Sequence, residues 1–326
     1  MKSIDSFKNF AHTKNGKRTI RTTKNATIAI ARTAFLLCMS YVLIYPLIYM
    51  ISLSVQSSSQ LLDPSVVWVP TGITLDNFAK AIQAMNYLKS LLFTLSVHIV
   101  SALIEIFVCA FVAYGFARFK FKGRDFIFVL VLLTILIPQE MIIVPLYVNF
   151  RNFDPLGIVS LFNSVTGSGA NVNLLNSGWV FYLPSLLGCG LRSGLFIFIY
   201  RQFFKGLPAE LEEAASIDGA GPIKTFLRIV LPSSGVAIIT VTVFSLVWHW
   251  NEYYLTTMYF SQEKSLSVAL SQISSLLTNI GISQYNIIVT SVSMAACVIT
   301  MAPMLIAYLF LQKHFIQSID RVGIVG

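Results

Sequence analysis

Six apolar segments dominate this sequence and restrict the fold to one that is built in a membrane. Each has about the 20 residues or more that a helix needs to cross the hydrocarbon core of a bilayer. The segments are residues 34–55, 91–117, 126–150, 179–200, 235–259 and 287–311. Only 11% of the 326 residues are charged, whereas a soluble domain has about 25%. The sequence therefore predicts an all-α, polytopic membrane protein with six transmembrane helices.

Five prolines fall inside these segments and predict kinked spans, because proline removes a backbone hydrogen bond within a helix. They are Pro46, Pro138, Pro145, Pro184 and Pro303. Such kinks are tolerated in a membrane where neighbouring helices or water satisfy the freed carbonyl groups.

The lysines and arginines predict the orientation. With the N-terminus placed in the cytoplasm, 18 of the 23 basic residues fall in cytoplasmic segments and four in outside loops. This distribution follows the positive-inside rule and puts both termini in the cytoplasm. It also explains the net charge of +9 without nucleic acid as a partner.

The ends of the chain are predicted to be short tails around one membrane domain. Residues 1–33 are polar and basic, and are either a disordered cytoplasmic tail or the n-region of a signal peptide. The following apolar run is long for a signal peptide and lacks a typical cleavage site, so we expect an uncleaved first helix. The membrane domain then covers residues 34–315, and residues 316–326 form a cytoplasmic C-terminal tail.

The two larger outside loops and the cysteines give weaker expectations. Residues 56–88 include a short surface helix capped by Asp76, and residues 151–178 are a flexible loop by composition. The four cysteines lie in apolar stretches without a CxxC motif, which favours buried thiols over a disulfide framework or a metal site. They are Cys38, Cys109, Cys189 and Cys297.

A polar hairpin at about residues 205–232 separates the fourth and fifth apolar segments. Pro208 suits the first position of a helix, and the acids that follow it suit the positive end of the helix dipole. We expect that helix to end at Gly219 or Gly221, Pro222 to open a second helix, and Pro232 to break the chain. Small residues would let another surface come close to the backbone. The residues alone leave two interpretations: an interfacial loop with no partner, or a docking element for a cytoplasmic protein.

The hairpin resembles the coupling loop of the membrane subunits of bacterial ABC importers. Their signature, E-A-A-x₃-G-x₉-I-x-L-P, is matched at every position, by Glu213, Ala214, Ala215, Gly219, Ile229, Leu231 and Pro232. The extended run RQFFKGLPAELEEAASIDGAG and residues 110–125, 137–147 and 248–254 resemble the carbohydrate branch, the MalG-like permeases. The resemblance covers about residues 75–315. The outer loop 157–178 is longer than this family leads us to expect.

The resemblance implies the type I ABC importer permease fold and a non-catalytic role in the bacterial plasma membrane. Glu213 would contact an ATPase subunit, Ala214 and Ala215 would allow close packing, Gly219 would permit the turn, and Asp218 lies in the same docking segment. The implied partners are a second homologous permease in a heterodimer, two nucleotide-binding ATPase subunits, an extracytoplasmic solute-binding protein and a mono- or oligosaccharide. ATP and Mg would be bound by the ATPase, because this chain has no G-x-x-x-x-G-K-[ST] phosphate loop and no expected cofactor or metal.

Ionisable residues at membrane depth are candidates for the translocation path. Glu105, Glu140 and Arg192 each lie about 20 Å along a predicted span. They either line a wet pathway or form structural ion pairs, and Arg192 has the further option of snorkelling along the lipid.

An aromatic and polar cluster adds a second set of path candidates. Trp250, Asn251, Glu252 and Tyr253 offer rings on which a sugar can stack and groups that bind hydroxyls. The alternative is the aromatic belt of a membrane interface. The single histidine of the second span, His98, is expected to be packed and hydrogen-bonded.

Three other functions stay open as alternatives. An ABC permease for a non-sugar solute such as a peptide would share the coupling loop. An ATP-independent secondary transporter often shows inverted repeats, which we do not find. A membrane enzyme would need a nucleophile–base or metal constellation, and the four histidines are scattered.

Overall fold

The computed structural model describes the backbone of residues 14–63 and 69–323, and the side chains of residues 25–63 and 69–312. All regular structure in these ranges is helical. Residues 1–13 of the predicted N-terminal tail and residues 324–326 of the C-terminal tail lie outside the described residues.

Three helical runs are long and apolar enough to cross a membrane. The first lies within α2 (Lys14–Ser54), and the third lies within α19 (Ile288–Gly323). The second, Tyr87–Arg118, consists of α5 (Tyr87–Phe93), the π-helix η1 (Thr94–Ile99) and α6 (Val100–Arg118). Two further spans result if each of two bent helix pairs is counted as one, which gives up to five among the described residues.

The bent and broken spans explain why the predicted count of six is not reproduced. α7 (Arg124–Leu136) and the helical run that begins with α8 (Gln139–Arg151) are bent by 103°. The second pair is the run Pro222–Ser233 followed by α15 (Gly235–Asn251), bent by 81°. The predicted fourth span is divided into α10 (Trp179–Leu186) and α11 (Ser193–Gly206), each too short to count alone.

Proline accounts for only some of these breaks. Pro138 stands at the N-cap of α8, where α7 has ended, but Pro46 and Pro303 lie inside continuous helices. The break between α10 and α11 instead contains two left-handed residues, Gly188 (φ 68°) and Arg192 (φ 63°). A left-handed residue cannot continue a right-handed helix, so the fourth span is interrupted there.

Short helices complete the chain. On the side of the first loop are α3 (Ser58–Leu61) and α4 (Asp76–Ala84). The second loop holds the 3₁₀ turn η2 (Pro155–Gly157) and α9 (Ile158–Thr166). The polar hairpin contains α12 (Glu210–Ile217), α13 (Pro222–Thr225), the π-helix η3 (Phe226–Val230) and α14 (Leu231–Ser233). After α15 come α16 (Tyr254–Tyr259), α17 (Leu266–Ser271) and α18 (Ile273–Asn279).

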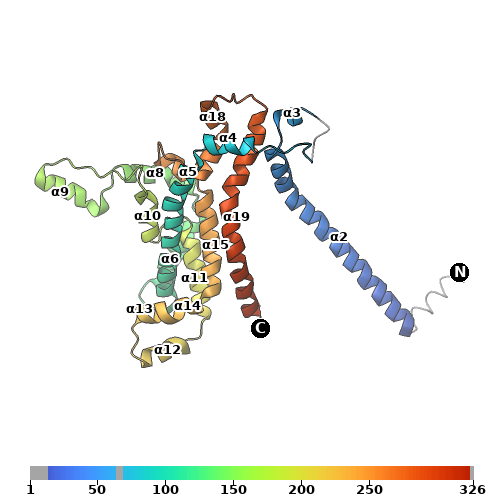
Figure 1. Cartoon of the computed structure of the whole chain (residues 1–326). Helices are drawn as coiled ribbons and strands as arrows, with labels where there is room; N and C mark the ends of the chain where they lie inside the picture. The colour runs from blue at the N-terminus through green and yellow to red at the C-terminus, as the bar shows by residue number, and fades with distance from the viewer. Residues whose placement is uncertain (1–13, 64–68, 324–326) are drawn as a thin grey trace.

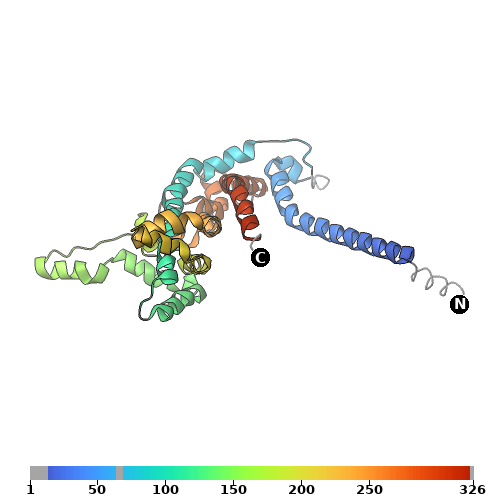
Figure 2. The same cartoon turned by 90° about the horizontal axis from the view of Figure 1, so that it is seen from below.

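The helices form a central bundle with two outlying arms (Figure 1). α6 packs on α11, α10 and α15, and α19 packs on α15, α4 and α2. α2 leaves the bundle on one side and α9 on the other, as the view from below also shows (Figure 2). The end of the bundle that carries α12 is opposite the end that carries α4 and α18 (Figure 1).

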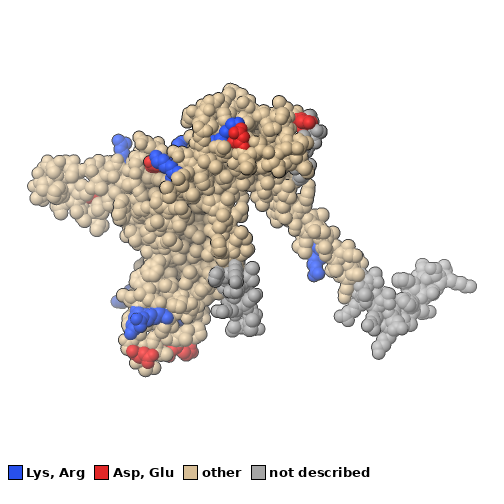
Figure 3. All heavy atoms as spheres, viewed as in Figure 1, with Lys and Arg blue, Asp and Glu red and all other residues tan. Residues whose placement is uncertain are grey.

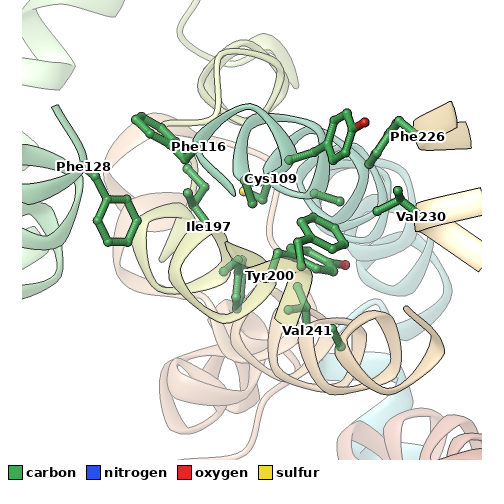
Figure 4. Packing of buried hydrophobic residues seen from close by; sticks show 14 residues of the cluster. Cys109, Phe116, Phe128, Ile197, Tyr200, Phe226, Val230 and Val241 are labelled. Carbon is green, nitrogen blue, oxygen red and sulfur yellow. The ribbon is translucent and has the colours of Figure 1, made fainter. Parts of the chain in front are cut away.

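An aromatic core joins the bundle to the polar hairpin (Figure 4). Tyr200, Phe204 and Phe226 are fully buried in it, and residues of α6, α7 and α15 contribute to the same cluster. The Phe226 ring lies 5.1 Å from that of Tyr114 and 6.4 Å from that of Phe204. Because η3 supplies Phe226 and Val230 to this core, the hairpin is fixed to the bundle by burial of apolar surface.

Three local expectations are corrected, while residues 316–323 of the predicted C-terminal tail continue α19. Residues 14–33 of the predicted N-terminal tail are helical, since α2 begins at Lys14. Asp76 is the first residue of α4, where it pairs with Lys80, and Leu75 is the N-cap. The loop 151–178 includes the helix α9, none of whose residues is buried.

The expectation of buried thiols holds for one cysteine. Cys109 is buried, Cys297 is intermediate, and Cys38 and Cys189 are exposed. An apolar neighbourhood in the sequence does not imply burial within the chain here, because the outer faces of membrane helices are themselves apolar.

Gly194 tests the packing of α11 on α7. A Cβ atom at Gly194 would clash with Thr134 Oγ1 and lie 2.9 Å from the carbonyl oxygen of Val131. We expect Gly194→Ala to cost about 1–3 kcal/mol through overpacking and to lower the thermal unfolding midpoint of the purified protein in detergent. The control is Gly115→Ala in α6, where a Cβ atom meets nothing within 4 Å and helix propensity favours alanine. Equal midpoints for the two variants would contradict this packing.

Candidate functional site

The polar hairpin has the predicted helix–turn–helix form with shifted ends. α12 begins at Glu210, two residues later than Pro208 suggested, because Ala209 is its N-cap. Gly219 adopts φ +74° in the turn, a conformation that disfavours residues with a Cβ atom. Pro222 opens α13 as expected. Pro232 lies inside the helical run, and the chain instead breaks at Ser234 before α15.

The exposed part of the hairpin is the turn and the outer face of α12. Glu213, Ala214, Asp218 and Gly219 are all exposed, and Ile217 is 87% exposed. Figure 3 shows acidic side chains at the tip of this end of the molecule and basic ones just above them. A surface of small, acidic and unshielded apolar residues is suited to contact with another protein. We call the second half of α12 and its turn, residues 213–221, the docking surface.

The other motif residues belong to the attachment of the hairpin. Ala215 is buried, and Leu231 packs against the aromatic core, while Ile229 is half-buried and Pro232 is exposed. The motif therefore combines exposed residues with residues that hold the hairpin in place.

An ion pair that sequence reasoning missed ties α12 to α6. Arg118 Nε lies 2.6 Å from Glu212 Oε1, and both side chains are largely buried. Arg118 Nη2 also donates to the carbonyl oxygen of Leu207 at 2.8 Å, and Tyr114 Oη donates to Glu212 Oε2 at 3.3 Å. The sequence signal was the paired acids 212 and 213, of which only the second belongs to the family motif.

A second site forms where three helices are interrupted. Glu140 follows the break between α7 and α8, Arg192 lies in the break between α10 and α11, and Glu252 separates α15 from α16. α8 contacts α16, and Arg192 lies over the ring of Trp248 near the end of α15, so the three breaks lie near one another. Irregular backbone at membrane depth occurs where it is buried in protein or lines a cavity.

A cavity of about 360 Å³ lies at two of these breaks. Its walls come from α7, α8, the 188–192 segment and the first turn of α11, and most of its lining residues are apolar. Arg192 and Gln139 supply polar groups to the wall. The Arg192 guanidinium carbon also lies 5.8 Å from the centre of the Trp248 ring. This cavity is the candidate position for a solute in the membrane domain.

Glu105 is not on the cavity wall but in a buried polar cluster behind it. The Ser193 hydroxyl donates to Glu105 Oε1 at 2.5 Å, and Ser245 and His249 lie 3.5 and 3.6 Å from Oε2. These partners come from α11 and α15, whereas Glu105 belongs to α6. Of the two interpretations given for Glu105, a wet pathway or a structural pair, these buried contacts favour the structural one.

The side chains of the predicted aromatic cluster, residues 250–253, lie in different environments and do not form one site. Trp250 is 5% exposed and donates through Nε1 to the carbonyl oxygen of Thr300 at 3.2 Å, so it packs on α19. Glu252 Oε1 accepts from the backbone N–H of Leu255 at 2.6 Å, while Asn251 and Tyr253 are exposed. None of these residues lines the cavity. His98 is fully buried and lies 3.1 Å from Thr256 Oγ1, as a packed and hydrogen-bonded histidine should.

Comparisons with known proteins agree with this architecture. The chain is 27% identical over 305 residues to the polygalacturonan/rhamnogalacturonan transport system permease protein YtcP of Bacillus subtilis, covering 90% of this chain and 97% of that protein. It is 26% identical to the arabinooligosaccharides transport system permease protein AraQ of Halalkalibacterium halodurans, covering 88% and 93%.

A solved structure and a family model extend the comparison. The fold is similar to a chain in the crystal structure of a bacterial ABC transporter involved in the import of the acidic polysaccharide alginate. The TM-score is 0.70 at 20% identity, covering 90% of this chain and 98% of that one. Residues 105–321 match the model of the binding-protein-dependent transport system inner membrane component family. This range includes the hairpin and all three breaks, and the chain belongs to that family of ABC importer permeases.

Proposed function

We propose that this chain is a transmembrane subunit of an ABC importer that forms the translocation path for a mono- or oligosaccharide. An extracytoplasmic binding protein delivers the sugar, and separate ATPase subunits drive the transport. The observation that carries this proposal is the docking surface, which exposes Glu213 and Gly219 on a hairpin fixed to the bundle core. The named sugar systems of YtcP and AraQ support the substrate class.

The structure supplies a route from the docking surface to the cavity. α12 is attached to α6 through Glu212 and Arg118, and η3 is attached through Phe226. α6 packs on α10 and α11, the two helices that flank the break at Arg192. A push on α12 by an ATPase subunit would therefore act on the helices around the cavity. Interdigitated packing transmits such a displacement because interiors are close-packed.

The remaining partners and the orientation follow from this role. The docking surface would face the cytoplasm, in agreement with the positive-inside count, and both termini would lie on that side. A second, homologous permease would complete the path as a heterodimer, and each permease would engage one of two ATPase subunits. ATP and Mg would be bound by those ATPases, with no cofactor in this chain.

Two alternatives predict different transport behaviour. A permease for a non-sugar solute would keep the ATPase but transport no sugar. A secondary transporter would run without ATP, and the exposed motif would then be a surface hairpin only. Uptake of labelled sugars with and without cellular ATP separates all three cases.

Charge reversal on the docking surface tests the coupling role. We expect Glu213→Lys to abolish co-purification of the ATPase subunit and to reduce sugar uptake at least about tenfold, since a like charge or lost contact at a docked interface costs several kcal/mol. Glu210→Lys is the matched control, because Glu210 is exposed on the same helix outside the motif. Wild-type uptake by Glu213→Lys, or equal losses in both variants, would contradict specific coupling through this motif.

Two substitutions at Gly219 separate turn geometry from partner contact. Asparagine tolerates the left-handed conformation better than other residues with a side chain, and a Cβ atom at Gly219 meets nothing within 4 Å of this chain. If Gly219 serves only the turn, Gly219→Asn keeps most ATPase binding and Gly219→Trp loses it through strain. If the ATPase packs against the bare backbone, both variants lose binding in co-purification while the isolated chain keeps its thermal stability.

The adjacent glutamates of α12 should behave differently. We expect Glu212→Ala to increase hydrogen exchange in residues 207–221 of the isolated chain, because Arg118 and Tyr114 lose their partner. Glu213→Ala should leave this exchange unchanged, since Glu213 is exposed and has no ion pair with another described residue. Removal of one partner of a largely buried ion pair costs about 3–5 kcal/mol. Identical exchange in both variants would show that the ion pair does not hold α12.

A further inference from the structure

Arg192 forms no ion pair with another residue in the described part of the chain. The partly or largely buried arginines elsewhere have carboxylate partners: Arg118 pairs with Glu212, and Arg201 pairs with Asp125. The Arg192 side chain, in contrast, is exposed within this chain and lies over the ring of Trp248 at the edge of the cavity. A cation in a membrane is costly without a counter-charge, and such residues mark the paths of substrates and ions.

The backbone around Arg192 holds the side chain at the cavity. Arg192 has φ +63°, which is uncommon for a residue with a side chain. Its neighbours Leu191 and Ser193 are both buried, and Ser193 is bonded to the buried Glu105. A strained residue that is fixed by packing on both sides is typical of a functional position. The packing of its two neighbours therefore fixes the backbone of Arg192 at the cavity wall, from which the exposed side chain can reach the cavity.

The cavity offers donors for an anionic ligand and few competing acceptors. Arg192 presents a planar guanidinium that matches a carboxylate in a bidentate way. The Gln139 amide lines the same wall without a hydrogen-bond partner among the described residues, whereas the Thr134 hydroxyl already donates to Val131 at 2.7 Å. Neither Glu140 nor Glu252 lines the cavity. Its volume of about 360 Å³ falls in the range of small-molecule sites, about 300–1,000 Å³.

We propose that this cavity binds a sugar unit that carries a carboxylate, so that the importer takes a uronic acid oligosaccharide. Arg192 binds the carboxylate, Gln139 bonds a ring hydroxyl, and the apolar walls contact the carbon face of the ring. This inference rests on the proposed transport function, since the sugar reaches the cavity only along the translocation path. In this proposal, Arg192 is the residue of the membrane domain that selects charged sugars over neutral ones.

The test compares one sugar with and without its charge. Cells that carry the complete importer are given labelled trigalacturonate or its methyl ester, which has the same ring framework but no carboxylate. We expect the wild type to prefer the acid, and Arg192→Gln to reduce acid uptake at least about tenfold with little change for the ester. Arg192→Lys keeps part of the preference because it keeps the charge. Arg151→Gln, which removes an exposed arginine away from the cavity, should match the wild type.

The design separates the possible failures. The binding protein is the same in every strain, so a change in the acid-to-ester ratio belongs to this chain. Equal loss of both sugars in Arg192→Gln would mean that Arg192 pairs with a partner subunit or a lipid headgroup, and would overturn the proposal. If the ester enters wild-type cells as fast as the acid, the sugar importer stands and the inference fails, even where Arg192→Gln does not assemble. If neither of these sugars enters but another labelled sugar does so in an ATP-dependent way, the inference fails and the sugar importer stands; if no labelled sugar enters in an ATP-dependent way, the proposed sugar transport fails as well.

Discussion

The burial of Phe226 among the rings of α6 and α11 is the interaction on which the rest of the structure depends. A polar hairpin at a membrane surface has little reason of its own to keep a fixed position, and its short helices are too short to be stable alone. By placing the side chains of η3 inside the aromatic core, the chain turns the hairpin into a rigid extension of the bundle. The Arg118–Glu212 pair then fixes the outer helix on the same support. The same aromatic core therefore supports both the docking surface and the bundle helices.

The interrupted helices are the second constraint. A continuous helix satisfies its own backbone groups, whereas a break leaves backbone groups that need other partners. Where α10 gives way to α11, the chain loses that continuity and forms part of a cavity wall that includes Arg192. The buried cluster around Glu105 joins α6, α11 and α15 just behind this wall. It supports the break from the side that faces the protein.

The helical membrane fold and the turn at Gly219 could be predicted from the sequence, because long apolar runs and the positions of glycine and proline are local signals. The family motif is likewise a short stretch that can be recognised without the structure. The number of continuous spans could not be predicted in this way, since Pro46 leaves α2 intact while a non-proline residue, Arg192, breaks the fourth span. Pairings such as Arg118 with Glu212 join residues distant in the sequence and have no local signature. Trp250 shows the same limit, because only the path of α19 decides that its indole is used in packing.

The helix α9 stands apart from the bundle and contributes no buried residue to it (Figure 1). Segments of this kind tolerate changes in length, because no core contact depends on them. The stretch around α9, residues 155–171, can therefore change in length while the cavity and the docking hairpin stay the same. It is also the natural position for an inserted reporter that leaves the transport machinery undisturbed.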